Sequence, residues 1–273
     1  MTFSLVACDL EARQWGVVVA SKFPSVGAVV PWARGDVGAV ATQSYANVMY
    51  GPDGLDRLAA GESAEAVVAA LTAADDEREQ RQLGVVDSKG GSATFTGSGC
   101  TSWAGGRTGH SYAAQGNILT GADVVDALAD TFEQTQGTLA RRMLAALQAA
   151  DDAGGDSRGR QGAAMAIRQT GGGYGGNNDI LFDLRVDDHP TPVPELHRLL
   201  DIHLLLFGKT PPEEFLPLDA DLRAEVQERL SALGHDSLDS WAGGENLEER
   251  IDPSGAAIDP ELLAVLRRQT VAG

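Results

Sequence analysis

Short runs of strand-forming residues, joined by turns too short to hold a helix, constrain the fold of this chain most strongly. Residues 4–8 and 16–22 are rich in Val and Ala, and only the polar segment 9–15 separates them. Residues 82–87 and 92–96 form a second such pair around a Ser-Lys-Gly-Gly turn. Parallel neighbours require a crossover of about a dozen residues or more, so both pairs predict antiparallel hairpins.

The remaining apolar patterns alternate between strand-like and helical periods. Helical spacing occurs in two successive patterns within residues 51–74, where Ser63 is a plausible N-cap, and again at residues 124–131 and 139–149. Further strands are expected at residues 37–43, 112–118, 162–167 and 180–186. This order predicts an α+β fold in which two antiparallel sheets stack and helices cover their outer faces.

The pattern becomes helical after Pro194. Residues 195–207 carry Leu and Ile at helical spacing, and Gly-Lys-Thr-Pro-Pro at 208–212 interrupts the chain. Short apolar spacings typical of further helices follow. We therefore expect two domains, one at residues 1–209 and a small all-α domain at residues 210–273.

Charge and composition disfavour several classes of partner. The 273-residue chain is 43% hydrophobic, enough for a substantial core, and its formal net charge is −18 at pH 7. Such a charge disfavours nucleic acid and anionic membranes, because contacts with phosphate require clustered Lys and Arg. No stretch is apolar enough to span a bilayer and no secretion signal is recognisable, so we expect a cytoplasmic protein.

Neither a metal nor a cofactor is expected. The two cysteines and five histidines lack the spacing of metal-ligand motifs. Gly171, Gly173 and Gly176 match the dinucleotide-binding string, but they lie between two strand candidates and open no helix. A flexible loop or a long hairpin turn is the better interpretation of this segment.

Thr2 is the residue that suggests a chemistry. Removal of Met1, which aminopeptidases perform before small residues, would leave Thr2 with a free α-amine beside its hydroxyl, a nucleophile and a base within one residue. The alternative is an ordinary strand residue behind a retained Met1. Three predicted strands, at residues 2–8, 16–22 and 37–43, bring polar groups toward one edge of a sheet.

Many blocks of the chain resemble one bacterial family. These blocks are residues 2–4, 16–24, 26–34, 39–43, 50–52, 81–87, 95–97, 114–119, 154–161 and 183–189. Together they are similar to the family called domain of unknown function 1028, which is grouped with the N-terminal-nucleophile hydrolases. The resemblance implies a four-layer αββα sandwich of that type. The small helical domain resembles a peptidoglycan-binding module that some members of the family carry.

The resemblance assigns Thr2 the position of the nucleophile, with its α-amine as the base. Ser4 lies two residues on, on the same strand face, where it would orient the amine or satisfy backbone groups. Lys22 ends the second strand and would lower the pKa of groups around the nucleophile; a solvated lysine is the alternative. Asp9, in the first turn, is a weaker catalytic candidate because Asp is common in turns.

Amide side chains are the candidates for contacts with the substrate. Asn117 is expected to donate a hydrogen bond to the oxyanion that forms during acyl transfer. Gln43, Asn47 and Gln82 are expected to bind the substrate. Each of these residues could instead do the capping and loop work that is usual for Asn and Gln.

These residues favour a hydrolase of an amide or related acyl bond in a small molecule or peptide. The alternative is a non-catalytic binding or assembly protein that keeps the sandwich while Met1 stays in place. We also expect a homo-oligomer, since docking or dimerisation is the simplest role for the helical domain. Contact with cell-wall polymer is disfavoured because no secretion signal is recognisable.

Overall fold

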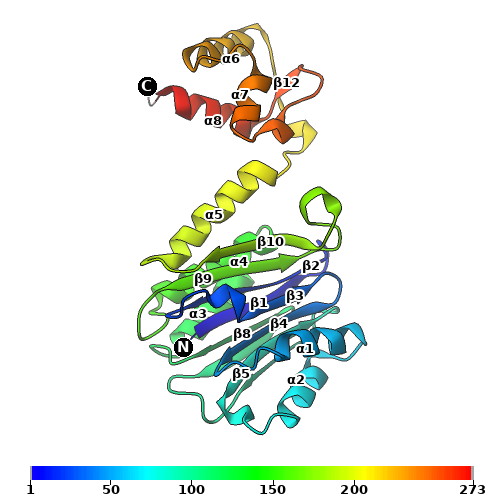
Figure 1. Cartoon of the computed structure of the whole chain (residues 1–273), viewed down its shortest axis with the longest axis vertical. Helices are drawn as coiled ribbons and strands as arrows, with labels where there is room; N and C mark the ends of the chain where they lie inside the picture. Colours follow the sequence, from blue (N-terminus) through cyan, green and yellow to red (C-terminus); the bar gives the residue numbers. More distant parts are fainter. Residues whose placement is uncertain (1, 272–273) are drawn as a thin grey trace. The chain divides into compact units, whose positions relative to one another are not determined.

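The computed structural model describes residues 2–271 (Figure 1). Two compact units divide the chain, one ending at His197 and the other beginning at Arg198. The expected removal of Met1 concerns a residue outside those described. The predicted Ser63 cap is confirmed, because its hydroxyl accepts a hydrogen bond from the Ala66 amide at 3.3 Å.

A six-stranded antiparallel sheet forms the larger part of the first unit. The predicted pairing of the first two runs is confirmed, with Phe3 opposite Ala20. From edge to edge the strands are β10 (Ile180–Val186), β9 (Gly162–Arg168), β2 (Gln14–Ser21), β1 (Thr2–Asp9), β8 (Tyr112–Asn117) and β7 (Gly105–Gly109). The first strand of the chain is therefore central, with β2 on one side and β8 on the other.

A second, four-stranded antiparallel sheet faces the first. Its order is β3 (Pro31–Arg34), β4 (Gly38–Ser44), β5 (Arg81–Asp87) and β6 (Ser92–Thr96), and β4 and β5 lie against β1 and β8 (Figure 1). The predicted hairpin of β5 and β6 is confirmed. Buried Val and Ala side chains of both sheets fill the space between them, including Val6, Val17, Val19, Ala39 and Ala41.

Each sheet carries one pair of helices on its outer side. Helices α1 (Tyr50–Ala59) and α2 (Ala64–Ala73) pack on the four-stranded sheet, and α3 (Asp123–Gln134) and α4 (Leu139–Asp152) pack on the six-stranded sheet. The buried face of α3 consists of Val124, Val125, Leu128, Ala129 and Phe132, which is the spacing of an amphipathic helix. The predicted α+β class with antiparallel sheets is confirmed.

The second unit is mainly helical. It contains the end of α5 (Pro192–Phe207), then α6 (Ala220–Ala232), α7 (Leu238–Gly244) and α8 (Pro260–Val271), and a two-residue strand pair, β11 (Leu216–Pro217) with β12 (Ala257–Ile258), that the sequence did not predict. Trp241, Leu262 and Leu266 are buried in its core. Short 3₁₀ turns complete the described chain at Val26–Ala28, Arg78–Gln80, Tyr174–Gly176, Pro212–Glu214 and Glu248–Arg250.

Candidate functional site

Strand register brings polar side chains together at one end of the space between the two sheets. In the pair of β1 and β8, Thr2 lies opposite Asn117 and Ser4 lies opposite Gln115. Side chains two residues apart share a face of a strand, and this face of β1 looks toward the four-stranded sheet. There Gln43 of β4 lies opposite Gln82 of β5. We call these six residues (Thr2, Ser4, Gln43, Gln82, Gln115 and Asn117) the amide cluster.

A directed chain of hydrogen bonds joins the cluster across the sheets. Gln115 Nε2 donates to Ser4 Oγ at 2.7 Å, and Ser4 Oγ donates to Gln43 Oε1 at 2.7 Å. Gln43 Nε2 then donates to Gln82 Oε1 at 2.8 Å, and Gln82 Nε2 donates to the Gly116 carbonyl at 2.7 Å. Because a carbonyl can only accept, the last bond fixes the direction of every bond before it.

A glycine in the opposite sheet makes room for this chain. A Cβ atom added at Gly84 of β5 would lie 2.1 Å from Gln115 Oε1, far closer than two such atoms can approach. Gln115 itself was not among the predicted site residues. The signal for it was its position two residues before Asn117, which places both side chains on one face of β8.

Thr2 is held at the start of β1 by contacts with β2 and with β4. Its Oγ1 lies 3.1 Å from Ser21 Oγ on β2, and its carbonyl accepts a hydrogen bond from Gln43 Nε2 at 3.3 Å. The residue is 6% exposed. Ser21 was not predicted as a site residue either, although extending the β1–β2 register by one residue from Phe3 and Ala20 brings it opposite Thr2.

Asn117 makes one hydrogen bond and leaves one buried atom without a partner. Its Nδ2 donates to Gln82 Oε1 at 2.9 Å. The residue is 1% exposed, and its Oδ1 has no hydrogen-bond partner among the described residues. An unpaired buried acceptor costs about 1–3 kcal/mol, so this carboxamide is held in an unfavourable state by its surroundings.

Within the described residues, Lys22 makes no hydrogen bond to the amide cluster. Its Nζ donates to the Arg160 carbonyl at 3.2 Å, and its backbone amide donates to Asp156 Oδ2 at 2.7 Å. Within residues 2–271, no hydrogen bond joins Lys22 to Thr2. No hydrogen bond therefore supports a direct effect of this ammonium on the Thr2 hydroxyl, and the role of Lys22 stays a prediction.

Asp9 lies at the opposite end of β1 from Thr2. It is the last residue of β1, seven positions after Thr2, which corresponds to about 23 Å along an extended strand. Its Oδ1 accepts a hydrogen bond from the Ala12 amide at 2.9 Å within the turn. This carboxylate organises the hairpin turn, and its catalytic role stays a prediction.

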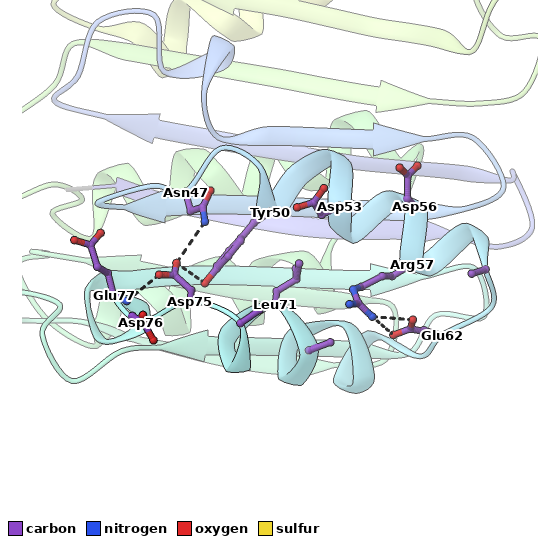
Figure 2. Close-up of a pocket in the computed structure, with 13 residues that line it drawn as sticks. Asn47, Tyr50, Asp53, Asp56, Arg57, Glu62, Leu71, Asp75, Asp76 and Glu77 are labelled. Carbon is purple, nitrogen blue, oxygen red and sulfur yellow. Dashed lines mark hydrogen bonds and ion pairs between the residues drawn. The ribbon is translucent and has the colours of Figure 1, made fainter.

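Asn47 belongs to a different region, a cavity of about 760 Å³ formed by α1, α2 and the segments next to them (Figure 2). Its Nδ2 is 3.4 Å from Asp75 Oδ2, which also accepts from Tyr50 Oη at 2.8 Å and Arg81 Nε at 2.9 Å. The Arg81 guanidinium holds the pKa of Asp75 well below its usual range. No hydrogen bond joins Asn47 to the amide cluster among the described residues, and its role in binding a substrate stays a prediction.

Carboxylates dominate this cavity. They belong to Asp53, Asp56, Glu62, Asp75, Asp76 and Glu77, and Arg57 pairs with Glu62 at 3.0 Å (Figure 2). No group of His, Cys, Asp and Glu among the described residues is arranged to hold a metal ion.

Burial raises the pKa of the Cys8 thiol to about 11, so this thiol is protonated and unreactive near neutral pH.

Comparison with known proteins places this architecture in a family. Residues 2–196 match the model described as "Family of unknown function (DUF1028)", and residues 206–266 match the model described as "Putative peptidoglycan binding domain". No curated protein matches. The chain belongs to the DUF1028 family, and both predicted resemblances are confirmed.

A solved structure of the same family is similar over most of the first unit. Protein SPO2555 from Silicibacter pomeroyi, a DUF1028 protein, shares 31% sequence identity with this chain. The match has a TM-score of 0.69 and covers 76% of this chain and 91% of that chain. The similarity supports the fold and the family, and it identifies neither a substrate nor an activity.

Proposed function

We propose that this protein hydrolyses an amide or related acyl bond in a small molecule or peptide, with Thr2 as an N-terminal nucleophile. The observation that carries the proposal is the environment of the Thr2 hydroxyl, which lies 3.1 Å from Ser21 Oγ at the start of the central strand. Two facing sheets with a helix pair outside each support the proposal, because N-terminal-nucleophile hydrolases have αββα layering. The match to the family model also begins at residue 2.

The proposed reaction proceeds in two halves. Thr2 Oγ attacks the acyl carbon while the α-amine accepts the hydroxyl proton, and collapse of the tetrahedral intermediate returns that proton to the leaving amine. An ester between Thr2 and the acyl group remains. Water then attacks this ester with the same amine as the base, which releases the acid and restores the hydroxyl.

The amide cluster supports this role by fixing the nucleophile. Gln43 holds the Thr2 carbonyl at 3.3 Å, and the buried chain through Gln82 leaves Gln43 few alternative positions. A reactive group held by buried, mutually bonded side chains needs little reorganisation during the reaction. The second N–H of Asn117 Nδ2 is the proposed oxyanion donor.

A non-catalytic binding or assembly protein is the second candidate. Two observations favour it: Thr2 is only 6% exposed, and the ammonium of Lys22 is bonded to Arg160 instead of Thr2. In that case the amide cluster is a polar element of the core. Its hydrogen bonds then contribute fold specificity and stability alone.

Intact mass and active-site labelling separate the two candidates. We expect a purified chain that lacks Met1 and takes up one equivalent of an electrophilic acyl or vinyl-sulfone probe at Thr2. Thr2→Ala should lose labelling and turnover, whereas Thr2→Ser, which keeps a hydroxyl, should retain part of both. A mass that retains Met1 in the folded protein would refute the nucleophile mechanism.

Over residues 2–271, no helix combines the length and the apolar character needed to cross a bilayer.

A further inference from the structure

One atom beside Thr2 has an unfilled hydrogen-bonding capacity. In the described part of the chain, Asn117 Oδ1 is the buried side-chain oxygen without a partner. Buried polar groups are nearly always paired in folded proteins, since leaving one unpaired costs about 1–3 kcal/mol. An acceptor kept unpaired at a candidate active site indicates that a donor arrives there.

The orientation of the Asn117 carboxamide follows from its neighbour. Gln82 Nε2 donates to the carbonyl of Gly116 at 2.7 Å and to that of Gly105 at 3.2 Å, so Gln82 Oε1 must be the acceptor. The atom of Asn117 that lies 2.9 Å from Gln82 Oε1 is therefore the nitrogen. Turning the carboxamide over would set two oxygens against each other. Oδ1 is consequently the atom left free.

The position of Asn117 relates this oxygen to Thr2. Directly opposite residues in an antiparallel pair place their side chains on the same face, with Cβ atoms about 4.5–5.5 Å apart. Asn117 is opposite Thr2 on β8, and Ser21 approaches the Thr2 hydroxyl from β2 at 3.1 Å. The amino-terminal end of Thr2 thus lies between strands that offer a hydroxyl and a free carboxamide oxygen.

Loss of Met1 changes the number of donors at this point. A peptide nitrogen at Thr2 carries one hydrogen, whereas a free α-amine carries two and its protonated form carries three. These new N–H groups require acceptors inside a largely buried site. When the amine accepts the hydroxyl proton during attack, its nitrogen gains a third N–H group.

We propose that Asn117 Oδ1 accepts a hydrogen bond from the free α-amine of Thr2 and is the positioning residue for the base. This inference rests on the proposed function, because it requires Thr2 to begin the chain. The bond holds one N–H against Asn117 and so restricts the direction of the nitrogen lone pair. It also favours the ammonium form, because an acceptor interacts more strongly with a charged donor, and it therefore raises the pKa of the amine.

The test is the pKa of the Thr2 amine, measured without reference to turnover. A cleavable amino-terminal fusion supplies protein that begins at Thr2. The carbon shifts of ¹³C-labelled threonine are then followed by NMR against pH, and Thr2→Ser identifies the Thr2 signal. Asn117→Leu, which is close in size and cannot accept a hydrogen bond, should lower the amine pKa by about one unit.

Two further variants keep the test decisive. Thr96→Val removes a bond at 2.9 Å to Gln82 within the same network, away from Asn117 Oδ1, and should leave the amine pKa unchanged. Asn117→Asp restores an acceptor and adds a negative charge, so the amine pKa should equal or exceed that of the parent protein. If Asn117→Leu does not fold, a pKa in Asn117→Asp below the parent value overturns the inference.

The outcomes also distinguish this inference from the proposed hydrolase. An amine pKa that is unchanged in Asn117→Leu overturns the role of Asn117, even if Thr2-dependent turnover is found. A lowered pKa supports that role. If such a lowered pKa accompanies a protein without turnover on a broad amide and ester panel, the hydrolase proposal alone fails.

Discussion

Replacing Gln82 by Leu should cost the first unit about 3 kcal/mol of unfolding free energy. Gln82 is fully buried, its Oε1 accepts from Gln43 and Asn117, and its Nε2 donates to Gly116, Thr96 and Gly105. Leucine has a similar volume and can make none of these bonds.

The magnitude follows from the groups that the substitution leaves unpaired. Asn117 Nδ2 loses its only described acceptor, and Gln43 Nε2 keeps only the longer bond to the Thr2 carbonyl at 3.3 Å. Each buried group left without a good partner costs about 1–3 kcal/mol, so two such groups give about 2–6 kcal/mol before the gain from an apolar side chain is subtracted. About 3 kcal/mol remains.

Urea unfolding followed by circular dichroism and tryptophan fluorescence measures this difference. With a slope of about 3 kcal/mol per molar urea for a unit of this size, the midpoint should fall by about 1 M. Gln136→Leu is the matched control, because the same substitution at an exposed position should stay within about 0.5 kcal/mol of the parent. Equal midpoints for Gln82→Leu and Gln136→Leu would refute the reasoning.

Two further predictions concern the stability of the two parts of the chain. Arg250 is buried, pairs with Asp259 at 2.7 Å and donates to the Leu204 carbonyl near the end of α5 at 2.6 Å. Arg250→Ala leaves Asp259 as a buried charge without its cationic partner, so the free energy of unfolding of the second unit should fall by about 3–5 kcal/mol. Unfolding followed by near-ultraviolet circular dichroism measures this loss. The control Arg268→Ala, at an exposed position, should not show it. We also propose that residues 1–209 fold alone with one cooperative unfolding transition; an insoluble or molten product would show that the remaining helices complete the core.

Local signals in the sequence predicted most of the elements. The Val-rich pairs predicted β1 with β2 and β5 with β6, because strand propensity and turn length act over a few residues. Ser63 predicted the start of α2 in the same way. Strand β7 (Gly105–Gly109) escaped prediction because Gly-Gly-Arg-Thr-Gly has no strand signal of its own, and only pairing with β8 makes it a strand.

The candidate site depended on information that local patterns do not carry. Thr2, Ser4, Gln43, Gln82 and Asn117 were named from the sequence, and the structure brings them into one cluster. Asn47 and Asp9 were named on the same grounds and lie elsewhere, because one turns toward Asp75 and the other ends its strand far from Thr2.

By itself, the sequence determined the class of fold, the family and the nature of the polar residues, since periodicity and turn chemistry are properties of neighbours along the chain. Only the tertiary structure decided which polar groups meet. Gln115 reaches Ser4 across 111 residues, and Ser21 reaches Thr2 across 19. These contacts exist because strand register aligns distant segments, and a shift of one residue would turn each of these side chains to the opposite face of the sheet.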